Sequence, residues 1–231
     1  MSDSSQTQSQ ILRVTCFEDL VSMPFQGSVN AICWNRNLVG DFSEIVEKIE
    51  LTDNVTVVDE EELRELTLTD QGQLAREIIL NDLQLLSAHG AAPVLNVIQK
   101  YDRDESFPFF PTDVYSFHID RSPVPTNTFL CTYFGDSSDI LPNSQGIQKI
   151  WVPEIRAELL KLYNGSIESF ETFLMENFFD LHYQALPNAE IMSLGVGHLW
   201  RLAVDHPESN ALPCLHRAPK ETTGKRLLLI C

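Results

Sequence analysis

The segment Phe117–Asp120, which reads Phe-His-Ile-Asp, limits the possible fold and function of this chain more than any other segment does. Side chains two residues apart on a β-strand point to the same face, so we expect His118 and Asp120 on one face and Ile119 on the other. A second strand that brings His216 alongside would place two imidazoles and one carboxylate together. Such a set leaves coordination positions open on a metal ion, which suits non-haem Fe(II) and oxygen chemistry. The sequence therefore predicts a metal site at His118, Asp120 and His216.

Two further side chains suit a ligand beside this metal. Arg226 follows His216 by ten residues and begins an apolar run that ends at Ile230. A guanidinium fixed near a metal suits bidentate capture of a carboxylate. Thr132 and Tyr133 lie on the strand expected after the His-x-Asp segment, and one of their hydroxyls should point into the pocket. For Tyr133 the alternative is packing in the core with its hydroxyl at the rim.

Taken alone, the His-x-Asp pair has a plain alternative, in which His118 is an ordinary strand histidine and Asp120 starts a turn. With His216 and Arg226, however, the pattern resembles the 2-oxoglutarate/Fe(II)-dependent dioxygenase superfamily. The resemblance implies a double-stranded β-helix of the jelly-roll or cupin kind. It also implies that the two histidines and Asp120 hold Fe(II), and that Arg226, with Tyr133, binds the co-substrate 2-oxoglutarate.

The same resemblance implies an activity, the hydroxylation of a substrate coupled to oxidative decarboxylation of 2-oxoglutarate. The chain departs from the pattern at Leu228, where many members of the superfamily have Ser or Thr. More closely, the chain resembles a small bacterial family of unknown function. The segments that carry this likeness are Val29–Arg36, Phe117–Asp120, Leu130–Gly135 and His216–Pro219.

Cys214 offers a different reading of the same cluster. It lies two residues before His216 and should share its face, so sulfur, nitrogen and oxygen ligands could together hold zinc. A free cysteine is more often a small buried hydrophobic residue. A zinc-binding, metal-sensing or metal-homeostasis protein is therefore the alternative to an oxygenase. A non-catalytic binding module on the same barrel is another, because a fold does not imply a function.

The remaining histidines are expected at the surface or at helix ends, with His206 as a substitute ligand if the strand register differs. No Gly-x-Ser-x-Gly elbow and no glycine-rich phosphate loop occurs, which disfavours hydrolase and nucleotide-binding classes. The histidines in question are His89, His182, His198 and His206.

Charge and composition limit the classes of partner and the cellular compartment that we expect for this protein. The 231 residues include 33 acidic and 16 basic side chains, a net charge of −17 that disfavours a nucleic-acid partner. No apolar run reaches the ~18 residues of a membrane helix, and the polar residues 1–10 do not resemble a secretory signal. Five cysteines without close spacing fit a reducing compartment, so we expect a cytoplasmic protein. No motif indicates whether its substrate is a small molecule or a protein.

Periodicity and turn residues predict an α+β fold in one domain, residues 11–231, after a disordered tail at 1–10. A helical insertion is expected at about 153–183, and flanking helices in the N-terminal half. The expected helices are Phe42–Ile49, Glu60–Leu66, Asp70–Ala88, Glu154–Tyr163 and Ser166–Tyr183. The expected strands are Ser28–Trp34, Asn54–Val58, Pro93–Tyr101, Val114–Ile119, Thr128–Phe134, Ile147–Val152, Glu190–Leu194, Leu199–Val204, Leu212–His216 and Arg226–Ile230, with a polar loop at Gly135–Pro142.

Overall fold

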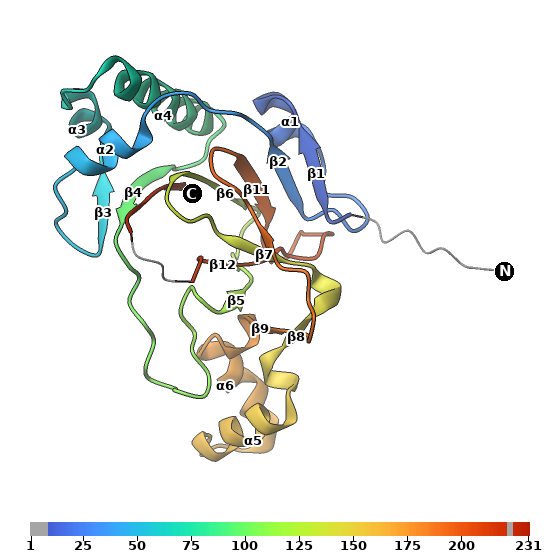
Figure 1. Cartoon of the computed structure of the whole chain (residues 1–231). Coiled ribbons are helices and arrows are strands. Elements are labelled where there is room, and N and C mark those ends of the chain that lie inside the picture. The colour runs from blue at the N-terminus through green and yellow to red at the C-terminus, as the bar shows by residue number, and fades with distance from the viewer. Residues whose placement is uncertain (1–8, 221–223) are drawn as a thin grey trace.

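Two β-sheets form the framework of the computed structural model, which describes residues 9–220 and 224–231 (Figure 1). Both sheets are antiparallel except for the parallel pair β1–β2. The predicted α+β class is confirmed. The larger sheet has the order β1 (Ile11–Val14), β2 (Ala31–Trp34), β11 (Leu199–Ala203), β6 (Asn127–Phe134), β13 (Arg226–Ile230), β4 (Val94–Ile98) and β3 (Val55–Val58). The smaller has the order β10 (Met192–Ser193), β7 (Asp139–Leu141), β12 (Leu215–Arg217), β5 (Phe117–His118), β9 (His182–Ala185) and β8 (Gly146–Gln148).

Four helices cover the outer face of the larger sheet, and two more lie at the opposite end of the molecule (Figure 1). The inserted pair connects β8 to β9, two neighbouring strands of the smaller sheet, and has its own apolar cluster around Phe170 and Phe179. No helix in the described ranges is long and apolar enough to cross a membrane. The helices are α1 (Phe17–Ser22), α2 (Phe42–Lys48), α3 (Glu60–Glu65), α4 (Asp70–Ala88), α5 (Pro153–Leu162) and α6 (Phe170–Glu176).

Local sequence signals explain where several helices begin and end. The Asp41 side chain accepts from the backbone N–H groups of Ser43 and Glu44, which caps α2 as predicted. The cap residue after α4 is His89, and Gly90 follows it at φ +93°, a conformation that a side chain would strain. Pro153 occupies the first turn of α5, where its missing N–H costs no hydrogen bond.

The inner faces of the two sheets meet in a shared apolar cluster. Trp200 and Leu228 from the larger sheet pack there with Ile140 from the smaller one and with Cys214, which directly precedes β12. Because side chains alternate along each strand, the polar residues that share these inner faces are brought between the sheets as well. This alternation sets the position of every candidate site residue described below.

Three predicted elements were wrong in their type or length. The expected helix Ser166–Tyr183 ends at Glu176, because Phe178 adopts a left-handed φ of 59° and the chain then enters β9. The expected loop Gly135–Pro142 contains β7, whose Ile140 and Leu141 are buried and paired with β12. The expected strand Val114–Ile119 is limited to Phe117–His118. The residues before it form a turn, in which the Asp113 carboxylate accepts from the Tyr115 N–H and the Asp113 carbonyl accepts from the Ser116 N–H.

Two other boundaries also differ. Only the first two residues of the expected strand Ile147–Val152 are extended, as part of β8, and a 3₁₀ turn at Lys149–Trp151 leads into α5. Of the predicted tail, residues 1–8 lie outside the described residues. Gln10 is bound to the fold, since its amide donates to the Leu141 carbonyl and accepts from the Asn143 N–H.

A buried ion pair fastens α4 to the larger sheet. Both nitrogens at the tip of Arg36 donate to the Asp82 carboxylate at 2.7 Å, and the Tyr133 hydroxyl donates to the same carboxylate at 2.6 Å. The side chain of Asp82 is fully buried and that of Arg36 is 8% exposed. Removing one partner from such a pair leaves an uncompensated charge in the core.

Replacing Asp82 by Ala is therefore expected to lower the free energy of unfolding by about 3–5 kcal/mol. Urea denaturation followed by circular dichroism measures this loss. Arg64→Ala is the matched control, because it breaks the exposed Arg64–Glu60 pair and should cost less than about 1 kcal/mol. Equal losses in the two variants would contradict the role given to Asp82.

Candidate metal centre

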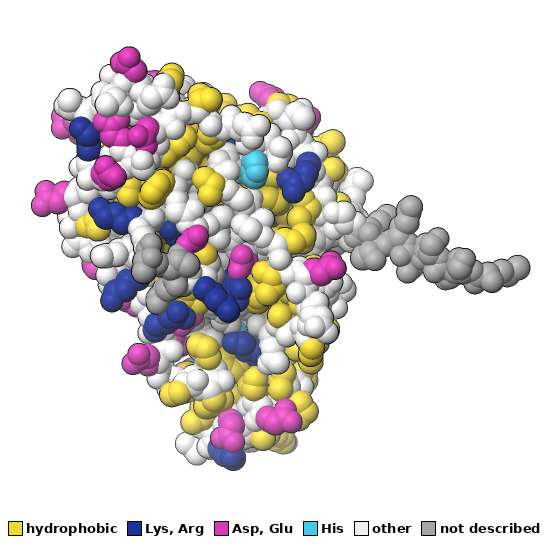
Figure 2. Space-filling model, viewed as in Figure 1, with side chains coloured by type: hydrophobic (Ala, Val, Ile, Leu, Met, Phe, Trp, Pro, Cys, Tyr) yellow, Lys and Arg dark blue, Asp and Glu magenta, His cyan; other side chains and the backbone are white. Residues whose placement is uncertain are grey.

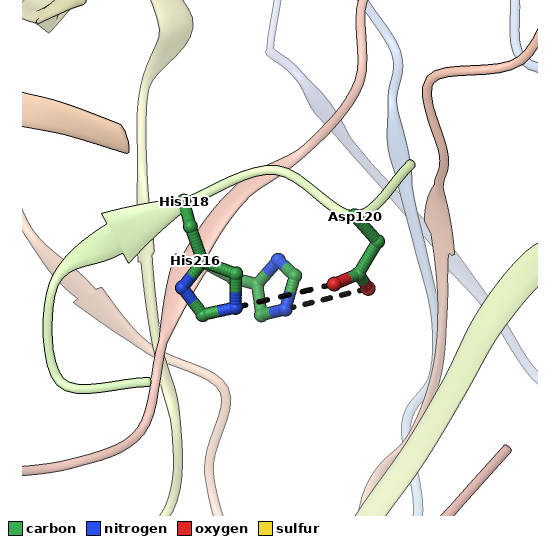
Figure 3. Close-up of side chains that lie close together, drawn as sticks. All are labelled: His118, Asp120 and His216. Carbon is green, nitrogen blue, oxygen red and sulfur yellow. Dashed lines mark ion pairs between the residues drawn. The ribbon is translucent and has the colours of Figure 1, made fainter. Parts of the chain in front are cut away.

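Backbone pairing of β12 with β5 brings two distant histidines together. His216 lies directly opposite His118 in this antiparallel pair, and their ring centroids are 4.5 Å apart. Asp120 follows β5 by two residues and turns its carboxylate toward both rings (Figure 3). The three side chains that the sequence singled out are thus neighbours in the fold.

The ligand atoms of these three residues all lie within 4.8 Å of one another. Nε2 of His118 is 3.9 Å from one Asp120 oxygen, and Nε2 of His216 is 3.6 Å from the other (Figure 3). Metal–nitrogen and metal–oxygen bonds of about 2.0–2.2 Å allow two ligand atoms on one ion to lie up to about 4.4 Å apart. Both nitrogen–oxygen separations are below this limit, and the side chains would draw closer together around a bound ion. The donor set therefore suits a single metal ion.

Neighbouring groups fix how each ligand is presented. The Nδ1 atoms of both histidines donate to backbone carbonyls, His118 to Ser116 at 2.8 Å and His216 to Cys214 at 3.2 Å. Such bonds select the tautomer that leaves Nε2 free to bind a metal. The Thr128 hydroxyl, on the inner face of the larger sheet, donates to Asp120. Both sheets thus contribute to the site.

Protonation states at neutral pH suit metal binding. Burial, followed by the neighbouring His216, lowers the pKa of His118 to about 4, so its imidazole is neutral. Burial alone would raise the pKa of Asp120, but His216, the Thr128 hydroxyl and His118 together lower it. A neutral imidazole and an ionised carboxylate are the forms that coordinate metals.

A cavity of about 240 Å³ opens beside this group. His118 and Asp120 line it together with His182, and its outer wall includes Arg121 and Phe178. A metal held by the three ligands would have its open positions close to this space. Exogenous ligands therefore have room on one side of the site.

Arg226 lines a second cavity, also of about 240 Å³. Its guanidinium donates to the hydroxyls of Thr132 and Ser138 at 3.3 Å and to Tyr101 at 3.5 Å. Burial lowers the pKa of this side chain, which is only 7% exposed, and Nε has no hydrogen-bond partner among the described residues. No described carboxylate lies within ion-pair distance of it, and Asp136 in the same cavity acts on its pKa only at longer range. A buried cation without a directly paired counter-ion is costly, which favours an anionic ligand here.

The second cavity is basic in an otherwise acidic protein. Lys100, Lys220 and Lys225 line it with Arg226, and among the described lining residues Asp136 supplies the one carboxylate. Lys and Arg side chains gather in the middle of the face seen in Figure 2, above the helical insertion. Among the described residues, the two cavities have no lining residue in common.

Tyr133 does not contact Arg226, contrary to the role expected for it. Its side chain is on the outer face of β6, where the ring stacks on Phe42 and the hydroxyl binds Asp82. Thr132, one residue earlier, faces inward and binds Arg226. The expectation that one of the two hydroxyls points inward holds, and alternation along the strand assigns it to Thr132.

Cys214 shares a face with His216 as predicted but does not belong to the group of ligand atoms. Its fully buried side chain packs between the sheets, and burial raises the pKa of its thiol well above the usual range. A neutral thiol is a poor metal ligand. The thiolate-assisted zinc site therefore gains no support from this geometry.

His182 was expected at the end of a helix and at the surface, and this was wrong. It begins β9, pairs with His118 and is 4% exposed. The apolar spacing before it favoured a continuous helix, and no local signal in a single sequence reveals its pairing with β5. His89 caps α4 as expected, His198 accepts the Arg36 backbone N–H, and His206 lines a neighbouring groove.

Comparisons with known proteins found no family model, curated protein or solved structure that matches the chain.

Metal-free protein is expected to lose stability as the pH falls from about 6.5 to about 4. In the unfolded chain His118 takes up a proton near its ordinary pKa of 6.5, whereas in the fold it does so only near 4. Within that window the unfolded state binds the extra proton, so acid favours unfolding, and the effect levels off below the folded pKa. Urea midpoints at about pH 7 and about pH 4.5 measure the loss.

His118→Gln should lose less stability over this window than the wild type. His89→Gln, which alters an exposed histidine, is the control and should behave as the wild type does. A loss in His118→Gln as large as that of the wild type would show that His118 is not the group responsible.

Proposed function

We propose that this protein is a mononuclear non-haem Fe(II) enzyme that uses 2-oxoglutarate to oxidise a substrate. The observation that carries the proposal is the group His118, Asp120 and His216, assembled across the β5–β12 pair. Two imidazoles and one carboxylate with open positions are typical of non-haem Fe(II) oxygenases. When bound, Fe(II) supplies the dioxygen chemistry that protein side chains lack.

A double-stranded β-helix is the fold that we propose for this site. Two mainly antiparallel sheets face each other across an apolar cluster, and the ligands lie on the inner face of the smaller sheet. Thr128 reaches them from the inner face of the larger one. A jelly-roll arrangement places functional side chains between two sheets in this way.

The proposed role of Arg226 is to bind the distal carboxylate of 2-oxoglutarate. Its burial, its unpartnered Nε and the lack of a directly paired counter-ion among the described residues all favour an anionic ligand. Thr132 and Ser138 hold the guanidinium in place through their hydroxyl groups. An arginine fork matches the planar carboxylate geometry better than a lysine would.

The route from Arg226 to the metal ligands runs along the inner face of β6. Asp120 contacts Thr128 and Arg226 contacts Thr132, and these threonines lie on one face of the strand. Their Cα atoms are about 13 Å apart at about 3.3 Å per residue. An extended dicarboxylate between the guanidinium and the metal would span part of this gap.

The chain's own residues have defined tasks in this scheme. The backbone carbonyls of Ser116 and Cys214 orient the imidazoles, and Thr128 holds the Asp120 carboxylate. Apolar side chains between the sheets, such as Trp200 and Leu228, exclude water from the space beside the ligands. These residues position and shield the site, and the substrate supplies the bond to be oxidised.

The proposal is tested by adding Fe(II) and then 2-oxoglutarate to metal-free protein without oxygen. A weak visible charge-transfer band should appear only when both are present. In Arg226→Ala the band should require at least about tenfold more 2-oxoglutarate, because a charge-assisted hydrogen bond contributes about 1.5–3 kcal/mol. Fe(II) binding itself should be unchanged in that variant.

Arg217→Gln is the matched control for the loss of charge. Arg217 lies one residue after His216, but it faces the other side of β12, where it pairs with Asp139. Its replacement should leave the band and its 2-oxoglutarate dependence intact. A wild-type protein that binds Fe(II) but shows no band with 2-oxoglutarate would refute the co-substrate assignment and leave the metal site standing.

A further inference from the structure

Three adjacent strands of the smaller sheet each place one histidine in the same row. His216 on β12 pairs with His118 on β5, and His118 pairs in turn with His182 on β9. Residues that pair directly across a sheet point to the same face. His182 therefore lies on the ligand-bearing face, on the side of His118 away from His216.

His182 is a buried polar side chain whose Nδ1 has no hydrogen-bond partner in the part of the chain that the structure describes. It is 4% exposed, and its ring lies 5.9 Å from that of His118 and edge-on to Phe110. Burial, and then the closeness of His118 and Lys149, lowers its pKa to about 3, so the ring is neutral. A buried polar atom left unsatisfied costs about 1–3 kcal/mol, and each such atom in a native structure calls for an explanation.

His182 lines the same cavity of about 240 Å³ as His118 and Asp120, while its Nδ1 is closed off from solvent. It lies outside the group of three ligand atoms, so it is not a fourth ligand in this arrangement. A molecule bound to an open position of the metal would extend into this cavity, toward the imidazole of His182.

We propose that His182 is a positioning residue, which hydrogen-bonds the exogenous ligand held at an open coordination position of the metal. This inference rests on the metal centre proposed above. The class of ligand is a small molecule or terminal group with a hydrogen-bonding atom next to the one that binds the metal, such as dioxygen or an oxyanion. The cavity beside His182 is then the reaction side of the metal, and the basic cavity at Arg226 is the co-substrate side.

The cavity beside His182 opens toward a groove on the protein surface. Arg121, Phe178 and Leu181 line it and also line a neighbouring groove of about 580 Å³. Phe178 is 61% exposed and has a left-handed backbone, a conformation that costs a bulky residue energy and that occurs often at functional sites. The groove therefore connects the reaction side to the surface beside the helical insertion.

The test uses Co(II) as a spectroscopic substitute for Fe(II) and azide as the probe. Azide binds a metal through one end, and its other end accepts a hydrogen bond. His182→Phe keeps an aromatic ring against Phe110 and removes both nitrogens. This variant should bind Co(II) as the wild type does but bind azide about tenfold more weakly, as measured from the visible Co(II) absorption. His182→Gln, which retains a donor and an acceptor, should recover part of the azide affinity.

His206→Phe is the control, because His206 lines the neighbouring groove and is not among the described residues that line this cavity, so the change should leave azide binding unchanged. His182→Leu is a second apolar variant in case the phenylalanine prevents folding. Unchanged azide affinity in the apolar variants would overturn this inference alone. Weaker Co(II) binding in them would show that His182 is a ligand and would also overturn it. A wild-type protein that binds no Co(II) would overturn the metal centre together with this inference.

Discussion

The site depends on one piece of backbone pairing, the antiparallel contact of β12 with β5. These strands are short, and only the His216–His118 pair is in register between them. A shift by one residue would turn His216 to the opposite face of the smaller sheet and separate the two imidazoles. The register is supported by β7 on the other side of β12, where Leu215 and His216 lie opposite Leu141 and Ile140. Leu215 also packs with Phe117 and Ile119 in the outer apolar cluster.

The larger sheet completes the site because its inner face carries a few polar side chains among apolar ones. Thr128 binds Asp120, and Thr132 binds Arg226, while Leu130 between them belongs to the cluster that joins the sheets. An acidic chain thus keeps one buried, positively charged position on this face. The N-terminal helices pack on the opposite face, fastened by the Arg36–Asp82 pair. Their contribution is to hold the sheet, and through it the site, in shape.

Features that depend on neighbours along the chain could be predicted from the sequence. The shared face of His118 and Asp120 follows from strand alternation, and α2 and α4 follow from apolar spacing and their caps. We could infer that His216 lies beside them only because two histidines and a carboxylate are a typical set of metal ligands. Features set by distant partners could not be predicted. Tyr133 belongs to the face of β6 that packs against the N-terminal helices, where Asp82 of α4 binds it, and His182 lies in the site because β9 pairs with β5.

The central claim is that His118, Asp120 and His216 bind one metal ion. It is tested most directly by growing crystals without oxygen, soaking them with Fe(II) and collecting diffraction data at the iron absorption edge. The account predicts one strong anomalous peak, about 2.0–2.2 Å from Nε2 of both histidines and from an Asp120 oxygen. An iron peak at other residues, or no peak in protein that is saturated with Fe(II), would contradict it.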